Sequence, residues 1–85
     1  MKKVKVDVWF CHISGLHETF VTVEMSEKDF DRYLPEAYYS ADSVPDVPCV
    51  NKLVKFARTL LNKEEGFKDY EFTAIEYSED NEEEE

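Results

Sequence analysis

The chain contains 85 residues, of which 20 are acidic and 10 are basic, so its net charge is −10 and its pI is about 4.5. A chain of this length folds as one small domain, which excludes a two-domain enzyme or a large barrel. Hydrophobic residues make up 42% and aromatic residues 14% of the sequence, values typical of a globular protein. The acidic excess argues against direct binding to nucleic acid or to an anionic membrane surface.

The acidic residues are concentrated at the C-terminal end of the chain. Residues 1–78 contain 14 acidic and 10 basic residues, a net charge of −4, whereas residues 79–85 carry the other six acidic residues. A block of like charges with nothing apolar to bury is typical of a disordered segment. We therefore expect a single domain over residues 1–78 and a disordered acidic tail over residues 79–85.

The cysteines and the N-terminal segment indicate a compartment. The sequence has two cysteines, Cys11 and Cys49, fewer than a small secreted scaffold normally contains. Lys5 and Asp7 interrupt the apolar residues near the N-terminus, which argues against a signal peptide. No stretch approaches the roughly 18–20 apolar residues of a membrane span. These patterns predict a cytoplasmic protein with free thiols, no membrane contact and no cofactor.

Two segments that alternate between apolar and polar residues predict a β-hairpin. The alternation has a period of two and runs over residues 4–10 and residues 20–25. Ser14–Gly15 lies midway between them and suits a two-residue turn, because glycine tolerates positive φ. With this turn the valines gather on one face, and Trp9 lies opposite Phe20 on the other face. A slip of one residue would break both arrangements.

Two helices are expected after the hairpin. Ser26 begins the first, because its hydroxyl accepts from the free amides of a helix start. This helix should end at about Leu34, since Pro35 disfavours helix at the residue before it, and a kink or turn should follow through Tyr39. Pro48 suits the first position of the second helix. The apolar stripe of the second helix comprises Val50, Leu53, Val54, Ala57, Leu60 and Leu61.

The aromatic and β-branched segment over residues 67–78 predicts a final strand. Its inward face stays open, because the set with Tyr70 and Phe72 and the set with Ile75 and Tyr77 are equally apolar. The expected fold is α+β with the order β-β-α-α-β: a three-stranded sheet built on the N-terminal hairpin, with both helices packed on the valine face. The final strand is expected to run parallel to the first strand; it could join either edge of the hairpin, and we favour a place beside the first strand.

The face of the sheet opposite the valines is the first candidate site. Trp9 and Phe20 lie there, and either Tyr70 and Phe72 or Ile75 and Tyr77 are expected to join them from the final strand. We assign Tyr70 and Phe72 to the site. Because both helices are assigned to the other face, these rings should form an exposed apolar strip, which is typical of a protein interface. The alternatives are an ordinary aromatic pair that stabilises the hairpin, or a helix that covers this face. The leading hypothesis is a small, non-enzymatic domain that binds another protein or a second copy of itself through this outer sheet face.

The cysteines and histidines suggest a metal or thiol site as a further alternative. Zinc requires four nitrogen or sulfur ligands, and the hairpin places His12 beside His17. Cys11 points to the opposite face from His12, however, and Cys49 lies on a distant helix. No paired C-x-x-C spacing is present. Of the two thiols, Cys49 is the better thiolate candidate, because a helix N-terminus favours an anion. We expect neither a metal site nor a catalytic cysteine.

The charges support two further hypotheses. An acidic inhibitor that mimics nucleic acid and binds a DNA- or RNA-binding protein needs carboxylates spread over a rigid surface. The second expected helix is instead basic, since residues 47–63 contain four basic and no acidic residues. That face could meet phosphates or an acidic partner, or it could be an ordinary solvated surface that balances its acidic neighbour. The acidic candidates are Glu27, Asp31, Asp42 and Asp46, and the basic candidates are Lys52, Lys55, Arg58 and Lys63.

Overall fold

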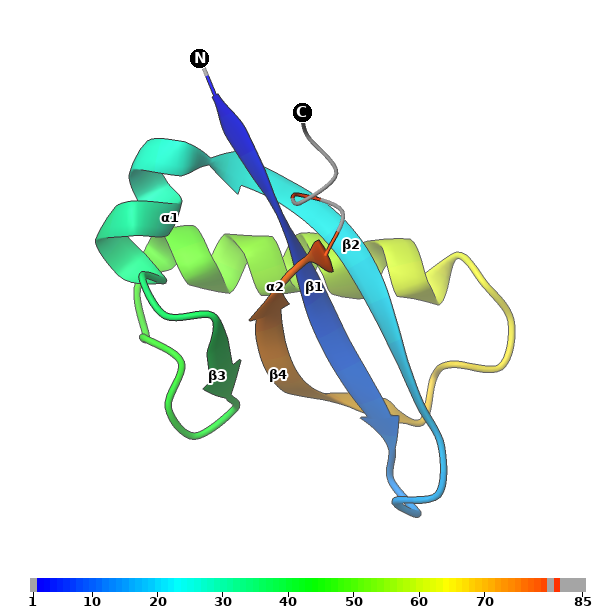
Figure 1. The fold of residues 1–85 in the computed structure, drawn as a ribbon. Coiled ribbons are helices and arrows are strands. Elements are labelled where there is room, and N and C mark those ends of the chain that lie inside the picture. The colour runs from blue at the N-terminus through cyan, green and yellow to red at the C-terminus, as the bar shows by residue number, and fades with distance from the viewer. Residues whose placement is uncertain (1, 80, 82–85) are drawn as a thin grey trace.

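The computed structural model describes residues 2–79 and 81 and has an α+β fold. Strands β1 and β2 form an antiparallel hairpin, and a four-stranded sheet has the order β2-β1-β4-β3 (Figure 1). All neighbouring strands in this sheet are antiparallel. The elements are β1 (Lys3–His12), β2 (Glu18–Ser26), α1 (Glu27–Tyr33), β3 (Tyr38–Ser40), α2 (Pro48–Asn62) and β4 (Tyr70–Tyr77).

The hairpin has the predicted register, but its turn is longer than predicted. Trp9 pairs with Phe20, and Val8 pairs with Val21 on the opposite, inner face of the sheet. The His12 amide donates to the His17 carbonyl at 2.8 Å, and the Gly15 amide donates to the His12 carbonyl at 2.8 Å. Residues 13–16 therefore form a four-residue loop, in which Gly15 supplies the positive φ of 81°. The two-residue turn is wrong, although the pairing that it implied is confirmed.

The sheet contains one more strand than predicted, and its final strand runs in the other direction. β3 pairs with β4 at the far edge of the sheet, where only a turn was expected. Each strand runs opposite to the strand before it in the chain, so with β3 between β2 and β4 the direction reverses three times between β1 and β4. β4 therefore lies beside β1 as expected but is antiparallel to it. The expected three-stranded sheet with a parallel final strand is wrong, whereas the α+β class is confirmed.

A β-bulge in β4 resolves which side chains of that strand face inward. Ile75 pairs with Val8 and Ala74 pairs with Trp9, but the register then shifts between Trp9 and Phe10, so that Phe72 rather than Thr73 pairs with Phe10. Thr73 is the extra residue, and its hydroxyl donates to the Trp9 carbonyl at 3.4 Å. Because a bulge adds one residue to the alternation, Tyr70 and Phe72 turn to the same inner face as Ile75 and Tyr77. The large side chains of the two sets predicted as alternatives therefore share one face, whereas Ala74 pairs with Trp9 on the outer face.

The core lies between the inner face of the sheet and α2. Pro48 begins α2 as predicted, and α2 crosses behind the sheet in the view of Figure 1, closest to β2. The apolar stripe of α2 contributes Val50, Leu53, Ala57 and Leu61 to the core. From the sheet, Val6 and Val8 are completely buried. Burial of apolar area of this kind is the main favourable contribution to folding.

The first helix is short and lies at one end of the sheet. Ser26 caps α1 as predicted, since its hydroxyl accepts from the Asp29 amide at 3.1 Å. The helix ends at Tyr33, and Leu34 follows with 1% of its surface exposed. No residue of α1 is fully buried, and its Phe30 ring packs on Tyr77 at 5.6 Å between centroids. α1 therefore closes one end of the core rather than covering the sheet.

The segment after β4 is attached to β1. The Ser78 amide donates to the Lys5 carbonyl at 3.2 Å. The Asn81 side chain accepts from the Lys5 amide at 3.0 Å and donates to the Lys5 carbonyl at 2.6 Å. Asn81 therefore supplies the pairing that β4 no longer provides. Most of the acidic tail predicted for residues 79–85 lies outside the described residues, so its disorder stays a prediction.

The Asn81 contact predicts a measurable contribution to stability. Asn81→Ala should lower the free energy of unfolding by about 1 kcal/mol, because both backbone groups of Lys5 lose a partner. Urea unfolding followed by tryptophan fluorescence measures this change. Asn62→Ala is the matched control, since Asn62 is exposed at the end of α2. Equal stability of the two variants would contradict the structural role of Asn81.

Candidate functional site

The outer face of the sheet carries an aromatic pair at the predicted position. The Trp9 and Phe20 rings are 4.7 Å apart between centroids and tilted by 38°. Phe20 is 47% exposed, and Trp9 is half-buried. We name this pair the outer aromatic surface. β3 adds Tyr38, 58% exposed, to the same face of the sheet. The sequence did not predict that Tyr38 lies on this face, because the three residues of β3 are too few to show the alternation of a strand.

Carboxylates surround the outer aromatic surface. The Trp9 indole donates to the Glu76 carboxylate at 2.8 Å, which fixes the orientation of the ring. The Thr22 hydroxyl donates to Asp7 at 2.7 Å on the neighbouring pair of the hairpin. A hollow of about 350 Å³ lies among these side chains. The surface is therefore aromatic at its centre and acidic at its rim, which does not suit an anionic ligand.

Tyr70 and Phe72 do not belong to the outer aromatic surface. The bulge in β4 places Phe72 opposite Phe10 on the inner face, where their rings meet edge to face at 6.4 Å between centroids. Tyr70 pairs with His12 and contacts its ring at 5.3 Å between centroids. The expectation that Tyr70 and Phe72 extend the Trp9 strip is wrong, because the added residue at Thr73 reverses their direction.

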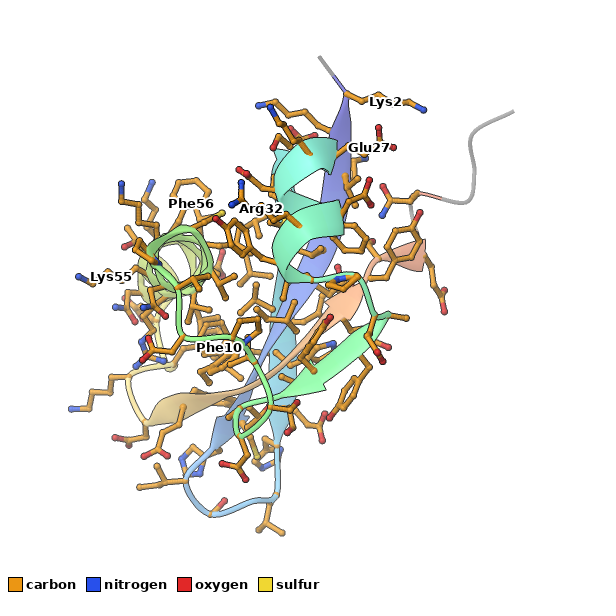
Figure 2. The ribbon with its side chains drawn as sticks, turned by 90° about the vertical axis from the view of Figure 1, so that its left-hand side faces the viewer. Lys2, Phe10, Glu27, Arg32, Lys55 and Phe56 are labelled. Carbon is orange, nitrogen blue, oxygen red and sulfur yellow. The ribbon has the colours of Figure 1, made fainter. Side chains whose placement is uncertain are left out.

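Tyr70 and Phe72 instead line a groove between α2 and β4. The groove has a volume of about 690 Å³, and Phe10 lies between α2 and the sheet (Figure 2). Val54 of α2 and Val44 of the preceding loop add further apolar lining. We name this feature the helix–sheet groove. Its principal lining residues are Phe10, Val44, Val54, Tyr70 and Phe72 on the apolar side and Lys52, Lys55, Arg58 and Glu71 at the rim.

Arg58 connects the two walls of the helix–sheet groove. Its guanidinium lies over the Phe10 ring at 5.6 Å from the centroid, a cation–π geometry. The same group donates to the backbone carbonyls of Tyr70 and Lys68, the latter at 3.2 Å. Arg58 therefore holds α2 to the start of β4. Lys52 and Lys55 of the basic face predicted for α2 project from exposed positions at the groove rim.

β2 forms a free edge of the sheet beside the outer aromatic surface. It spans nine residues and pairs with β1 on one side only. The His12 amide donates to the His17 carbonyl, so His12–His17 is a hydrogen-bonded position and every second pair further along the hairpin is bonded as well. The amides and carbonyls of Glu18, Phe20, Thr22 and Glu24 therefore point away from β1. On the inner side of this edge lies Phe56 of α2, 55% exposed.

The cysteines and histidines do not form a metal site. Within residues 2–79 and 81, no group of three or more histidine, cysteine or acidic side chains could hold a metal ion. His12 accepts from the Ser14 amide through Nδ1 at 3.0 Å, and this nitrogen also bonds to the Ser14 hydroxyl at 2.8 Å. His12 is thus part of the hairpin loop. Cys11 donates to the neighbouring His12 carbonyl at 3.4 Å.

Cys49 is not the activated thiolate that its helix position favours. Burial, followed by the Asp29 carboxylate of α1 and a hydrogen bond to it, raises the pKa of the Cys49 thiol. Lys52 acts in the opposite direction but does not reverse the shift. Burial and the acidic group of the neighbouring helix thus raise the pKa of a thiol whose position at a helix N-terminus favours the thiolate.

The acidic residues proposed for nucleic-acid mimicry are distributed over two elements. Glu27 and Asp31 lie on α1, whereas Asp42 and Asp46 lie in the loop before α2. Asp46 accepts from the Asn51 side chain at 3.0 Å, which gives it a local structural role. The fold therefore provides no further support for nucleic-acid mimicry.

Comparison with known proteins identifies no relative: no family model, curated protein or solved structure matches the chain. Among the described residues, no helix is sufficiently long and apolar to cross a membrane. The function is therefore argued from the outer aromatic surface, the β2 edge and the helix–sheet groove.

The environment of Cys49 predicts slow alkylation at neutral pH. Because its raised pKa keeps the thiol protonated, the rate should rise only at higher pH than for an ordinary thiol. Asp29→Asn should move the profile to lower pH, and Lys52→Gln should move it to higher pH. Iodoacetamide labelling with peptide mass mapping measures both shifts. Rapid labelling of Cys49 below the ordinary thiol pKa would contradict this assignment.

Proposed function

We propose that this protein is a protein-binding domain that associates with a second copy of itself through the edge of β2. The observation that carries this proposal is the nine-residue free edge flanked by the exposed Phe20 ring. A long edge strand is a template for pairing with another strand, and aromatic side chains commonly anchor protein interfaces. The proposed activity is binding, because an unpaired strand edge and an exposed aromatic ring are contact surfaces for another chain.

The backbone of β2 supports antiparallel pairing between two copies. In a dimer with a two-fold axis, the same strand edge contacts itself. An axis at Phe20 places this residue opposite its counterpart, so both Phe20 rings and both Trp9 rings form one aromatic cluster. Thr22 then lies opposite Glu18, and Glu24 lies opposite Leu16. An axis at Val21 would instead bring Glu18 against Glu24, and opposed like charges are unfavourable.

The inner side of the β2 edge also suits a second copy. Phe56 lies beside Val23 and Glu24 and is 55% exposed. Leu16, in the hairpin loop, is 79% exposed. With the axis at Phe20, Leu16 of each copy lies opposite Glu24 of the other copy, and Phe56 lies on the inner side of the shared edge. The proposed pairing therefore covers the exposed Phe20 ring of each copy and brings further exposed apolar side chains to the shared edge, which favours association.

The dimer is tested by replacing the residue at the proposed axis. Phe20→Lys should weaken dimerisation at least about tenfold, because it removes the aromatic contact and brings two cations together. Sedimentation equilibrium measures the dissociation constant. Tyr38→Lys is the matched control: it changes an equally exposed ring on the same face but at the β3 edge, and it should leave dimerisation unchanged. Circular dichroism verifies that both variants are folded.

Salt provides a second measurement. Each copy carries a net charge of −10, so screening should strengthen the proposed dimer as ionic strength rises. A wild-type protein that stays monomeric at every accessible concentration and salt level would contradict the proposal. Equal dimerisation of wild type and a folded Phe20→Lys variant would also contradict it, because the contact would then lie elsewhere.

A further inference from the structure

We infer that the helix–sheet groove binds a fatty-acid-like anion: an apolar chain that lies along the groove and ends in a carboxylate held by Lys52 and Lys55. The groove lies on the inner side of the sheet, opposite the outer aromatic surface. This inference is therefore independent of the proposed dimer. It assigns a role to the basic face of α2, which the association through β2 does not use.

The apolar part of the groove determines the body of the ligand. Phe10 and Phe72 form its floor, and Val54 forms the wall contributed by α2. Phe72 and Val54 are only half-buried, so apolar surface at the core of the protein remains accessible to water. Covering such surface with an alkyl chain is favourable by the hydrophobic effect. The groove volume of about 690 Å³ lies within the usual range of ligand sites.

The charges at the rim determine the head group of the ligand. Lys52, Lys55 and Arg58 line the groove against a single carboxylate, Glu71. Arg58 already donates to two backbone carbonyls and lies over Phe10, so it shapes the end of the groove. Lys52 and Lys55 are exposed, and Figure 2 shows Lys55 extending from α2 towards solvent. Lysine ammonium groups act as compact point charges, which suits a carboxylate head group with one charge.

The local charge also opposes the overall charge of the protein. A net charge of −10 repels anions in general, whereas α2 and its flanking residues over 47–63 carry four basic and no acidic residues. An anionic amphiphile is therefore directed to this region of the surface and away from the acidic rim around Trp9. Charge complementarity and the apolar floor together specify one class of ligand.

The probe is dodecanoate, titrated below its micelle concentration into ¹⁵N-labelled full-length protein. Amide shifts should change in a saturable manner at Phe10, Val54 and Phe72 and stay constant at Trp9 and Phe20. Dodecyltrimethylammonium, which has the same chain and the opposite charge, should not shift the groove residues. Octanoate should bind more weakly, by about two- to fourfold for each methylene removed, because the chain supplies most of the binding free energy.

Two sets of variants separate the head-group contacts from the floor. The double variant Lys52→Glu with Lys55→Glu should weaken dodecanoate binding about tenfold or more, because repulsion replaces attraction at the rim. Lys63→Glu is the matched control, since Lys63 follows the same helix but lies outside the groove lining. Val54→Trp should block binding without any change in charge, because the larger side chain fills the groove.

Each outcome of these titrations decides the inference. Saturable shifts in the groove that depend on the two lysines and not on Lys63 support it. Absence of saturable binding, shifts centred on Trp9 and Phe20, or equal binding of the carboxylate and the quaternary amine would overturn it. Binding of an acidic amphipathic peptide but not of dodecanoate would also overturn it, because the groove would then be a peptide site. Dimerisation of Phe20→Lys is measured separately, so failure of either proposal is recognised independently.

Discussion

The width of one helix limits how much of this sheet can be covered. An α-helix with its side chains is about 10–12 Å across, and neighbouring strands are about 4.8 Å apart, so one helix covers about two strands. α2 lies closest to β2, and α1 is a seven-residue helix at the end of the sheet. The N-terminal part of β4 is therefore only partly covered by α2, and the accessible groove between α2 and β4 follows from this incomplete cover.

The β-bulge at Thr73 decides which side chains of β4 face α2 and line the groove. It directs Phe72 and Ile75, which are separated by an odd number of residues, to the same face of the sheet. The inner face gains an aromatic floor next to the basic side of α2. Trp9 stays on the outer face, where its partner on β4 is Ala74 and not another aromatic residue. One extra residue in a strand thus creates two surfaces of different chemistry.

Local patterns in the sequence predict the hairpin and the helix starts because each depends on neighbouring residues. The pairing of Trp9 with Phe20 follows from alternation about Gly15, and Ser26 and Pro48 mark the helix starts through their own chemistry. β3 has no such signal, because three residues do not establish a period. The direction of β4 depends on this missing strand. The groove was not predicted because it depends on the bulge at Thr73. A polar residue between apolar residues of a strand fits the usual alternation, so the sequence gives no sign that Thr73 is an extra residue.

The most direct test of this account is the register of β4 against β1, measured by nuclear Overhauser contacts in solution. The account predicts contacts of Val8 with Ile75 and of Phe10 with Phe72 in the same spectrum, which requires one extra residue between the two pairs. An unbroken register would instead pair Phe10 with Thr73 and turn Phe72 to the face of Trp9. Observation of that register would contradict both the aromatic floor of the groove and the assignment of the two surfaces.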